Sequence, residues 1–166
     1  MELPIRPLTE ADVSRVMEVQ AATFACLPSP RWYFGSTAEE FADTIAEGMA
    51  FGAFDGDVPA GFCIFHRDRG YAAEAGLPPE RCLSFADVMV RPEYRRRGLH
   101  TRFLALAEDC AARRGLGYII ATADPDNEPS RASFRKAGYR ELPQREMYDG
   151  RPRLVLVKEL PAGKSN

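Results

Sequence analysis

The segment from residue 82 to residue 123 shows a strand pattern, a helix pattern and a second strand pattern in succession. Residues 82–90, CLSFADVMV, are apolar, and Pro92 ends the run because proline cannot donate to a strand ladder. After Gly98, apolar residues recur at helical spacing, and GYIIATA at 117–123 is typical of a buried strand. A helical crossover between two strands of one sheet makes them parallel.

Further strand and helix patterns lie on both sides of this segment. They are a strand at 3–7, a helix at 13–24, a helix after the capping residue Thr37, two strands around the Asp-Gly turn in 49–67, a loop at 67–80, a helix at 130–138, and two strands in 139–160 joined at Asp149-Gly150. The order is β, α, α, β, β, β, α, β, α, β, β, which predicts an α/β (α+β) fold with a mixed sheet.

Charge and composition exclude several classes of protein. With 22 Lys+Arg against 24 Asp+Glu, the net charge is -2, whereas a nucleic-acid-binding domain is usually strongly basic. The four cysteines form no C-x-x-C pair, and only two histidines are present to help build a metal site. The first residues lack an export signal, and no stretch approaches the roughly 20 apolar residues of a membrane span. We expect a cytoplasmic protein with no metal, nucleic-acid or membrane partner.

Gly98 lies where the predicted strand passes into the predicted helix, and arginines surround it. These are Arg91, Arg95, Arg96, Arg97 and Arg102. The first N–H groups of a helix have no partners within it, and the helix dipole favours negative charge there. Glycine permits close approach to the backbone, and guanidinium groups suit phosphate oxygens. A phosphate site is the favoured interpretation, and a solvated charged run is the alternative.

Residues 90–100, V-R-P-E-Y-R-R-R-G-L-H, resemble the acetyl-CoA-binding motif of the GNAT superfamily of N-acetyltransferases. That motif reads V-x-P-x-[YF]-[RQ]-x-x-G-x-[GA]. A later family motif is an Asn followed eleven residues on by Gly and an aromatic residue, and it has a counterpart in Asn127, Gly138 and Tyr139. The resemblance to this family covers nearly the whole chain.

The resemblance implies one acetyltransferase domain over residues 3–160, followed by a loose tail at 161–166. The implied fold is a mixed, mostly antiparallel twisted sheet of about six to seven strands with about four helices. In the family, the strand that corresponds to 82–90 carries a bulge that splays it from the parallel strand corresponding to 117–123. The pantetheine arm of the coenzyme lies in that gap.

The resemblance also implies which residues hold the coenzyme. Backbone N–H groups from Arg96 to Thr101 would bind the pyrophosphate, and a main-chain N–H near Met89 or Val90 would polarise the acetyl carbonyl. The residues expected to bind acetyl-CoA, the co-substrate, are Val88, Met89, Val90, Arg95, Arg96, Arg97, Gly98, Leu99, His100, Thr101, Asn127, Ser130 and Phe134.

Two positions depart from the family pattern. His100 stands where the family prefers Gly or Ala, so its imidazole must either turn away from the pyrophosphate or donate to it. Phe134 stands at the position of the family's general-acid tyrosine, and phenylalanine cannot protonate a leaving thiolate. Tyr139, Tyr148 and Ser133 are the candidate substitutes, although Tyr139 also fits the family's buried aromatic position. Alternatively, the thiolate leaves unprotonated or is protonated through water.

Acetyl transfer to an amine requires the neutral amine. An alkyl ammonium has a pKa of about 10.4, so a base or a water chain must remove a proton. Asp87 is the first candidate because it lies in an otherwise apolar strand, where burial would raise its pKa. The alternative is that Asp87 bonds backbone amides at the bulge. Glu74 and Glu80 are further candidates.

The predicted function is transfer of an acetyl group from acetyl-CoA to a primary amine of a small molecule or peptide, by direct attack in a ternary complex. The alternative is a non-catalytic acyl-CoA-binding regulatory module, which Phe134 and His100 favour. Acceptor choice is expected to reside in the variable loops at 25–36 and 67–81. The resemblance also implies that a homodimer can form.

Overall fold

The computed structural model describes residues 2–68, 70–143, 145–147 and 150–161. The chain divides into two compact units: Met1–Phe65 with Asp87–Phe103, and His66–Ala86 with Leu104–Asn166. Each unit is built from two separate stretches of sequence, so β3, β4 and α4 contribute residues to both. In the described ranges, no helix has the length and apolar character needed to cross a membrane. Tyr148, Asp149 and residues 162–166 of the predicted tail lie outside them.

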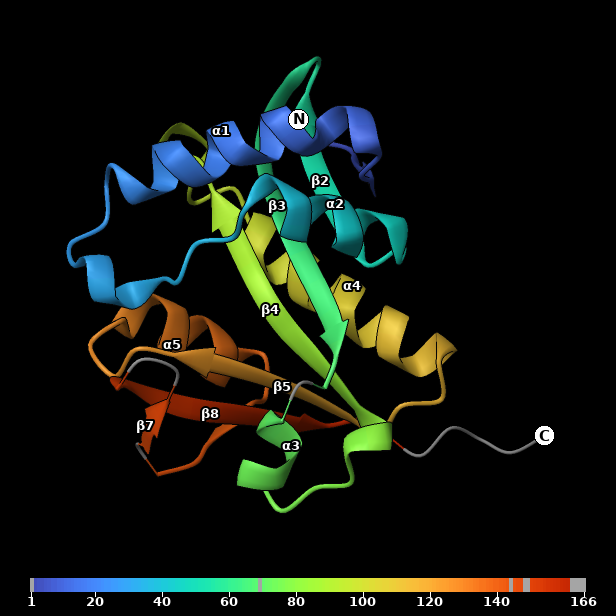
Figure 1. Ribbon diagram of the computed structural model, residues 1–166, viewed down its shortest axis with the longest axis vertical. Coiled ribbons are helices and arrows are strands. Elements are labelled where there is room, and N and C mark those ends of the chain that lie inside the picture. Colours follow the sequence, from blue (N-terminus) through green and yellow to red (C-terminus); the bar gives the residue numbers. More distant parts are fainter. Residues whose placement is uncertain (1, 69, 144, 148–149, 162–166) are drawn as a thin grey trace. The chain divides into compact units, whose positions relative to one another are not determined.

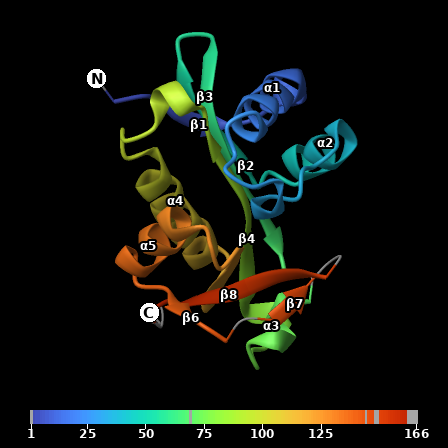
Figure 2. The same cartoon turned by 90° about the vertical axis from the view of Figure 1, so that its left-hand side faces the viewer.

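An antiparallel sheet with helices on one face forms the first unit. Its elements are β1 (Ile5–Pro7), α1 (Val13–Phe24), α2 (Ala38–Ala46), β2 (Ala50–Asp55), β3 (Val58–Arg67) and the C-terminal half of β4 (Cys82–Val90). Strand β2 pairs antiparallel with β1 and, as the Asp-Gly turn predicts, with β3. Figure 2 shows α1 and α2 side by side against these strands. Phe41, Phe62 and Met89 belong to the buried cluster of this unit.

Capping contacts start the helices of the first unit. The Thr37 hydroxyl accepts a hydrogen bond from the Glu40 N–H at 3.2 Å, and the Glu40 carboxylate accepts one from the Thr37 N–H at 2.7 Å. Ahead of α1, the Thr9 N–H donates to the Asp12 carboxylate at 2.8 Å, and Arg6 pairs with the same carboxylate. These contacts satisfy N–H groups that a helix start leaves open, which confirms the predicted cap at Thr37.

Parallel pairing of β4 with β5 organises the second unit. Its elements are α3 (Tyr71–Glu74), the N-terminal half of β4, most of α4 (Leu99–Arg113), β5 (Tyr118–Ala123), α5 (Glu128–Lys136), β6 (Arg140–Glu141), β7 (Arg145–Met147) and β8 (Arg151–Glu159). The parallel register runs from Cys82 opposite Tyr118 to Phe85 opposite Ala121. Strand β8 pairs antiparallel with β5, β6 and β7. The predicted mixed fold with its central parallel pair is thus confirmed (Figure 1).

Two segments differ from their predictions. Residues 67–80 were predicted as loop but contain α3, because the Asp68 carboxylate accepts hydrogen bonds from the N–H groups of Gly70 and Ala72. In the C-terminal region, the first of the two predicted strands is divided into β6 and β7. Proline at position 143 lies between them, and it cannot continue a ladder.

Candidate functional site

The turn between β4 and α4 combines a proline, a left-handed arginine and a left-handed glycine. After β4 ends at Val90, Pro92–Tyr94 form a short 3-10 helix. Arg96 then has φ of 63° and Gly98 has φ of 73°, and α4 begins at Leu99. Among the described residues, Arg96 is the one non-glycine residue with positive φ. This strained backbone is the kind found at ligand-binding turns, and it lies where the sequence predicted the phosphate site.

The first backbone N–H groups of α4 have no carbonyl acceptor within the helix. The first α-helical hydrogen bond of this helix joins the Arg102 N–H to the Gly98 carbonyl at 3.1 Å. The N–H groups that precede Arg102 in the first turn therefore have no acceptor within the helix itself. A Cβ added to Gly98 would meet nothing within 4 Å, so the space around it is open. These donors and the open space suit the oxygens of a phosphate group.

The five arginines around this turn have different surroundings. Arg91 pairs with Glu18 at 3.5 Å and with Glu93 at 3.9 Å. Arg102 donates to the Leu3 carbonyl at 2.6 Å and pairs with Glu2. In contrast, Arg95, Arg96 and Arg97 are exposed, and none of the three pairs with a described acidic residue. The expected anion-binding arginines are therefore the ones left available for a ligand.

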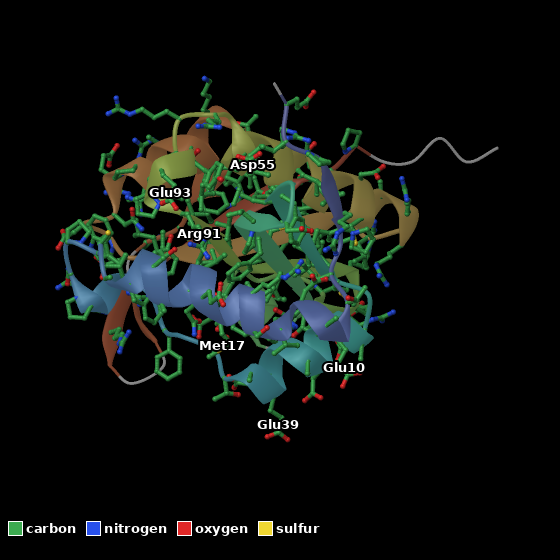
Figure 3. All side chains as sticks on the ribbon, turned by 90° about the horizontal axis from the view of Figure 1, so that it is seen from above. Glu10, Met17, Glu39, Asp55, Arg91 and Glu93 are labelled. Atoms are coloured by element: carbon green, nitrogen blue, oxygen red, sulfur yellow. The ribbon has the colours of Figure 1, made fainter. Side chains whose placement is uncertain are left out.

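Tyr94 anchors the turn to the β2–β3 hairpin. Its hydroxyl donates to the Asp55 carboxylate at 3.0 Å, and the Arg97 guanidinium lies 5.0 Å from the centre of its ring. Figure 3 shows Asp55 in the same region as Arg91 and Glu93. The hydrogen bond to Asp55 raises the pKa of Tyr94. The phenol therefore stays protonated, as it must to hold the turn in place.

His100 is half-buried at the departure from the family motif. Burial lowers the pKa of its imidazole to about 4. The ring is therefore neutral at physiological pH and adds no positive charge to the turn. Electrostatic attraction for an anion there comes from the helix start and the exposed arginines.

Two side chains near the end of β4 are buried. Met89 is 2 % exposed and packs in the core of the first unit, and Val88 is also buried. A Cβ on Gly61 of β3 would lie 2.7 Å from the Met89 carbonyl oxygen, so only glycine allows this close approach of β3 to β4. The sequence did not single out Gly61. The bulge expected in β4 stays a prediction.

Asp87 is the half-buried carboxylate of this strand. The Ser36 hydroxyl lies 3.4 Å from its Oδ2 atom. Burial raises the pKa of Asp87 to about 6, the Ser36 contact lowers it, and the negative charge of Glu40 raises it further. The carboxylate is thus mostly ionised at neutral pH, yet it binds a proton more readily than an ordinary aspartate. This is the property that the sequence required of a general base.

Gln20 holds Ser36 in place through two hydrogen bonds. Its Nε2 donates to the Ser36 carbonyl and its Oε1 accepts from the Ser36 N–H, each at 2.9 Å. The sequence showed Gln20 only as a polar residue at an apolar-face position of α1, and it gave no indication of Ser36. A polar side chain on a buried helix face requires a hydrogen-bond partner. This requirement was the one sign in the sequence that Gln20 contacts another polar group.

The burial of Asp87 predicts a stability effect of its replacement. We expect the Asp87→Asn variant to be about 1–2 kcal/mol more stable than the wild type at alkaline pH. The folded-state pKa of about 6 lies above the unfolded value of 3.8, so wild-type stability falls as the pH rises through this window. The asparagine amide carries no charge, so the variant does not lose this stability as the pH rises. Urea unfolding at about pH 4 and about pH 8 measures the difference in stability between the variant and the wild type, which should nearly vanish at the lower pH. An equal difference at both pH values would contradict the raised pKa of Asp87.

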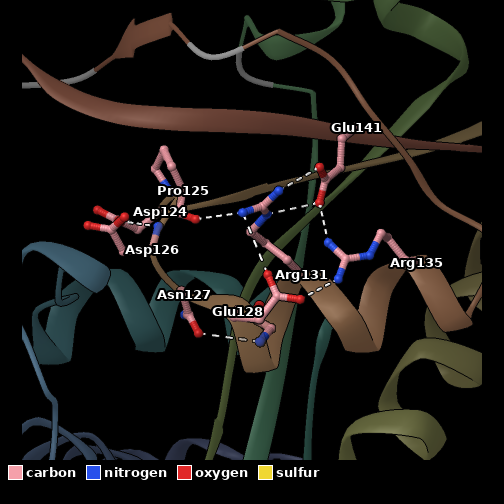
Figure 4. Close-up of polar contacts among 9 residues, drawn as sticks. Asp124, Pro125, Asp126, Asn127, Glu128, Arg131, Arg135 and Glu141 are labelled. Carbon is pink, nitrogen blue, oxygen red and sulfur yellow. Dashed lines mark hydrogen bonds and ion pairs between the residues drawn. The ribbon is translucent and has the colours of Figure 1, made fainter.

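In the second unit, the turn from β5 into α5 holds Asn127. Asn127 is 5 % exposed, and its Oδ1 accepts a hydrogen bond from the Ser130 N–H at 3.3 Å, so it caps α5. Arg131 donates to the Pro125 carbonyl at 2.7 Å and pairs with Glu141 at 2.9 Å (Figure 4). Asn127 is thus a helix N-cap, and its expected role toward the coenzyme stays a prediction.

A buried ion pair supports the same turn. The Asp124 carboxylate is fully buried, lies 3.1 Å from the Arg153 guanidinium of β8, and also accepts from the Asp126 N–H at 2.9 Å. Removing one member of such a pair leaves an uncompensated buried charge. The pair therefore ties the turn before Asn127 to β8.

Phe134 and Tyr139 lie in an aromatic cluster of the second unit. Ring centres are 5.8 Å apart for Phe85 and Phe134, and 5.0 Å apart for Phe134 and Tyr139. Burial raises the pKa of Tyr139, and its buried hydroxyl has no hydrogen-bond partner among the described residues. Tyr139 therefore fits the buried aromatic position while keeping a proton to donate. Tyr148, the other candidate acid, lies outside the described residues.

Comparison with known protein families matches residues 16–139 to the Acetyltransferase (GNAT) family. The chain belongs to the GNAT acetyltransferase family. The match includes the β4–α4 turn and ends at Tyr139. The protein is therefore an acetyltransferase, as its sequence predicted, and no curated protein matches it.

Solved structures share the GNAT fold at low sequence identity. The yncA protein of Salmonella typhimurium, solved with its cofactor acetyl-CoA, is 16 % identical with a TM-score of 0.77, over 99 % of this chain and 98 % of that one. The ribosomal-protein-alanine N-acetyltransferase of Brucella melitensis is 21 % identical with a TM-score of 0.75, over 95 % and 100 %. Ard1 of Thermoplasma volcanium is 12 % identical with a TM-score of 0.77, over 97 % and 99 %. These likenesses confirm the fold.

Proposed function

We propose that this GNAT acetyltransferase transfers the acetyl group of acetyl-CoA to a primary amine of a small molecule or a peptide. One observation carries the proposal: the β4–α4 turn presents N–H groups without a helical acceptor, open space at Gly98 and exposed guanidinium groups together. This is the chemistry that a coenzyme pyrophosphate requires. Structural relatives solved with acetyl-CoA or CoA support the assignment.

Asp87 is the proposed general base. Its carboxylate takes a proton from the ammonium form of the acceptor, and the neutral nitrogen then attacks the acetyl carbonyl in a ternary complex. The new N–C bond forms as the C–S bond breaks, the positively charged nitrogen loses its extra proton to solvent, and the CoA thiolate leaves. A main-chain N–H of Met89 or Val90 stabilises the oxyanion in this scheme. The raised pKa of Asp87, about 6, supports this role.

Two tyrosines are the proposed proton donors to the thiolate. The case for Tyr139 is its buried hydroxyl, which has no hydrogen-bond partner among the described residues and so could donate to a ligand. Burial raises its pKa, which makes it a weaker acid than an ordinary tyrosine. Tyr148 is proposed from sequence alone. Protonation through water is the remaining route, since Phe134 offers none.

The segment between α1 and α2 is proposed to form part of the acceptor site. Tyr33 packs on the core of the first unit and fixes the segment, whereas Phe34 is 59 % exposed. Ser36, two residues further on, reaches Asp87. The exposed ring of Phe34 and the carboxylate of Asp87 both lie near this segment. They suit an acceptor amine that also has an apolar part. Glu39 instead points into solvent on α2, as expected for a wet helix face (Figure 3).

Three measurements test the proposed function. Calorimetry with acetyl-CoA should show binding, and release of free thiol should require an added amine from a panel of small amines and peptides. Mass spectrometry of the acceptor should show the added acetyl group. Binding without turnover on any amine would favour the alternative of a non-catalytic module, for which Phe134 is the argument, and failure to bind CoA would remove both.

A further inference from the structure

We propose that Ser36, held by Gln20, is a positioning residue that orients the Asp87 carboxylate and leaves its Oδ1 atom available to take the acceptor's proton. The inference rests on the proposed role of Asp87 as base. It assigns a function to two residues that the family motifs do not include. All three residues lie in the first unit, on α1, on the segment that follows it, and on β4.

Gln20 holds the backbone of Ser36 in place. A primary amide has one donor side and one acceptor side, and Gln20 uses them on the carbonyl and the N–H of the same residue, both at 2.9 Å. Gln20 is 8 % exposed, so water competes little for these bonds. The backbone of Ser36 is therefore held as it would be by a neighbouring strand, although no strand is present there.

The Ser36 hydroxyl points toward the Asp87 carboxylate. It donates to Oδ2 of Asp87 across 51 positions of sequence, at 3.4 Å. This distance is long for an O–H···O bond, as catalytic hydrogen bonds in ligand-free sites often are. With Oδ2 engaged, Oδ1 has no hydrogen-bond partner among the described residues. One oxygen of the carboxylate is thus anchored and the other is left for the substrate.

Two neighbours, Glu40 and Ser36, influence the ionisation of Asp87. Glu40, on α2, is the acidic neighbour whose charge opposes ionisation of Asp87, while the Ser36 hydroxyl favours ionisation. The two neighbours therefore act on the same carboxylate with opposite signs. Replacing each of them separately should shift the titration of Asp87 in opposite directions, which a purely structural role of Ser36 would not produce.

The experiment measures the Asp87 titration directly by carboxyl carbon-13 NMR on coenzyme-free protein. We expect Ser36→Ala to raise the pKa of Asp87 by about half a unit and Glu40→Gln to lower it by a similar amount. The amide oxygen introduced by Glu40→Gln can still accept from the Thr37 N–H, so the α2 cap persists. Ser36→Thr keeps the hydroxyl and should restore the wild-type titration. Ser29→Ala, in the same segment, removes a hydroxyl that contacts the Arg31 N–H and should leave the Asp87 titration unchanged.

A double-mutant cycle tests whether Gln20 acts through Ser36. Gln20→Met alone should raise the pKa of Asp87, because it releases Ser36, but should add little in the Ser36→Ala background. The acidic limb of the profile of kcat/KM against pH should move with each NMR titration. An unshifted Asp87 titration in Ser36→Ala would overturn the inference.

The NMR readout separates this inference from the proposed function. If Asp87 titrates as expected in the variants but the acidic limb of kcat/KM does not follow, Asp87 is not the base, and the proposed mechanism fails while the contact stands. If the acidic limb follows Asp87 in the wild type but Ser36→Ala leaves both unchanged, the inference about Ser36 fails and the base assignment stands.

Discussion

The Asp87→Asn variant is expected to lose about 100- to 1,000-fold in kcat/KM for acetyl transfer to an amine, while binding acetyl-CoA as the wild type does. The loss follows because asparagine cannot accept the ammonium proton, whereas the neutral amide has nearly the shape of the carboxylate. In the wild type, kcat/KM should fall below a pH of about 6, where Asp87 becomes protonated. The variant should lack this limb, because no group at position 87 then titrates.

Steady-state rates from about pH 5 to about pH 9 and calorimetry with acetyl-CoA together check this result. Asp57→Asn, at the exposed turn between β2 and β3, is the matched control and should keep wild-type rates. A variant at position 87 with unchanged kcat/KM across the pH range would remove Asp87 from the mechanism. Proton removal would then fall to a water chain or to another carboxylate.

Replacing Gly98 with valine is expected to weaken acetyl-CoA binding at least about 30-fold, equivalent to about 2 kcal/mol. At a φ of 73°, a residue with a side chain meets a conformational cost of about 1–2 kcal/mol, more for a β-branched one. Because a Cβ there meets no protein atom within 4 Å, the branched side chain would occupy the open space where the phosphate is proposed to lie. Calorimetry with acetyl-CoA and with free CoA measures the loss.

Gly115→Val supplies the matched control for backbone strain. Gly115 has a φ of 68°, a Cβ there would also meet nothing within 4 Å, and it lies in the second unit, beyond the end of α4. Both variants should lose similar stability in thermal unfolding, but only Gly98→Val should lose coenzyme affinity. Equal affinity in the two variants would show that the turn does not hold the pyrophosphate.

Much of the fold could be predicted because its signals are local. Proline after β4, the glycine before α4 and the apolar spacing of α4 together specify a strand, a turn and a crossover helix, and the parallel pairing of β4 with β5 follows from them. The helix caps at Thr37 and Asn127 are equally local, since each joins residues three positions apart. Helix α3 was missed because it has only four residues and lies among Gly70, Gly76, Pro78 and Pro79, which are typical of a loop.

The coenzyme turn could be predicted for a similar reason, but the selection among its arginines could not. Backbone conformation at Gly98 follows from the glycine itself. Arg91 and Arg102 contact Glu18 and Leu3, among other partners, and these two residues lie 73 and 99 positions away. No spacing rule connects such residues, so only folding shows which arginines already have partners and which are exposed.

By itself, the sequence determined the order of the elements apart from α3 and the division of β6 from β7, and it also determined the parallel crossover, the GNAT motif at the β4–α4 turn and the candidacy of Asp87. The tertiary structure decided the surroundings of that carboxylate: the hydroxyl of Ser36, the clamp of Gln20 and the charge of Glu40. The physical reason is that backbone preference and periodicity act over a few residues, whereas the pKa and orientation of a buried group depend on whichever distant side chains packing brings against it.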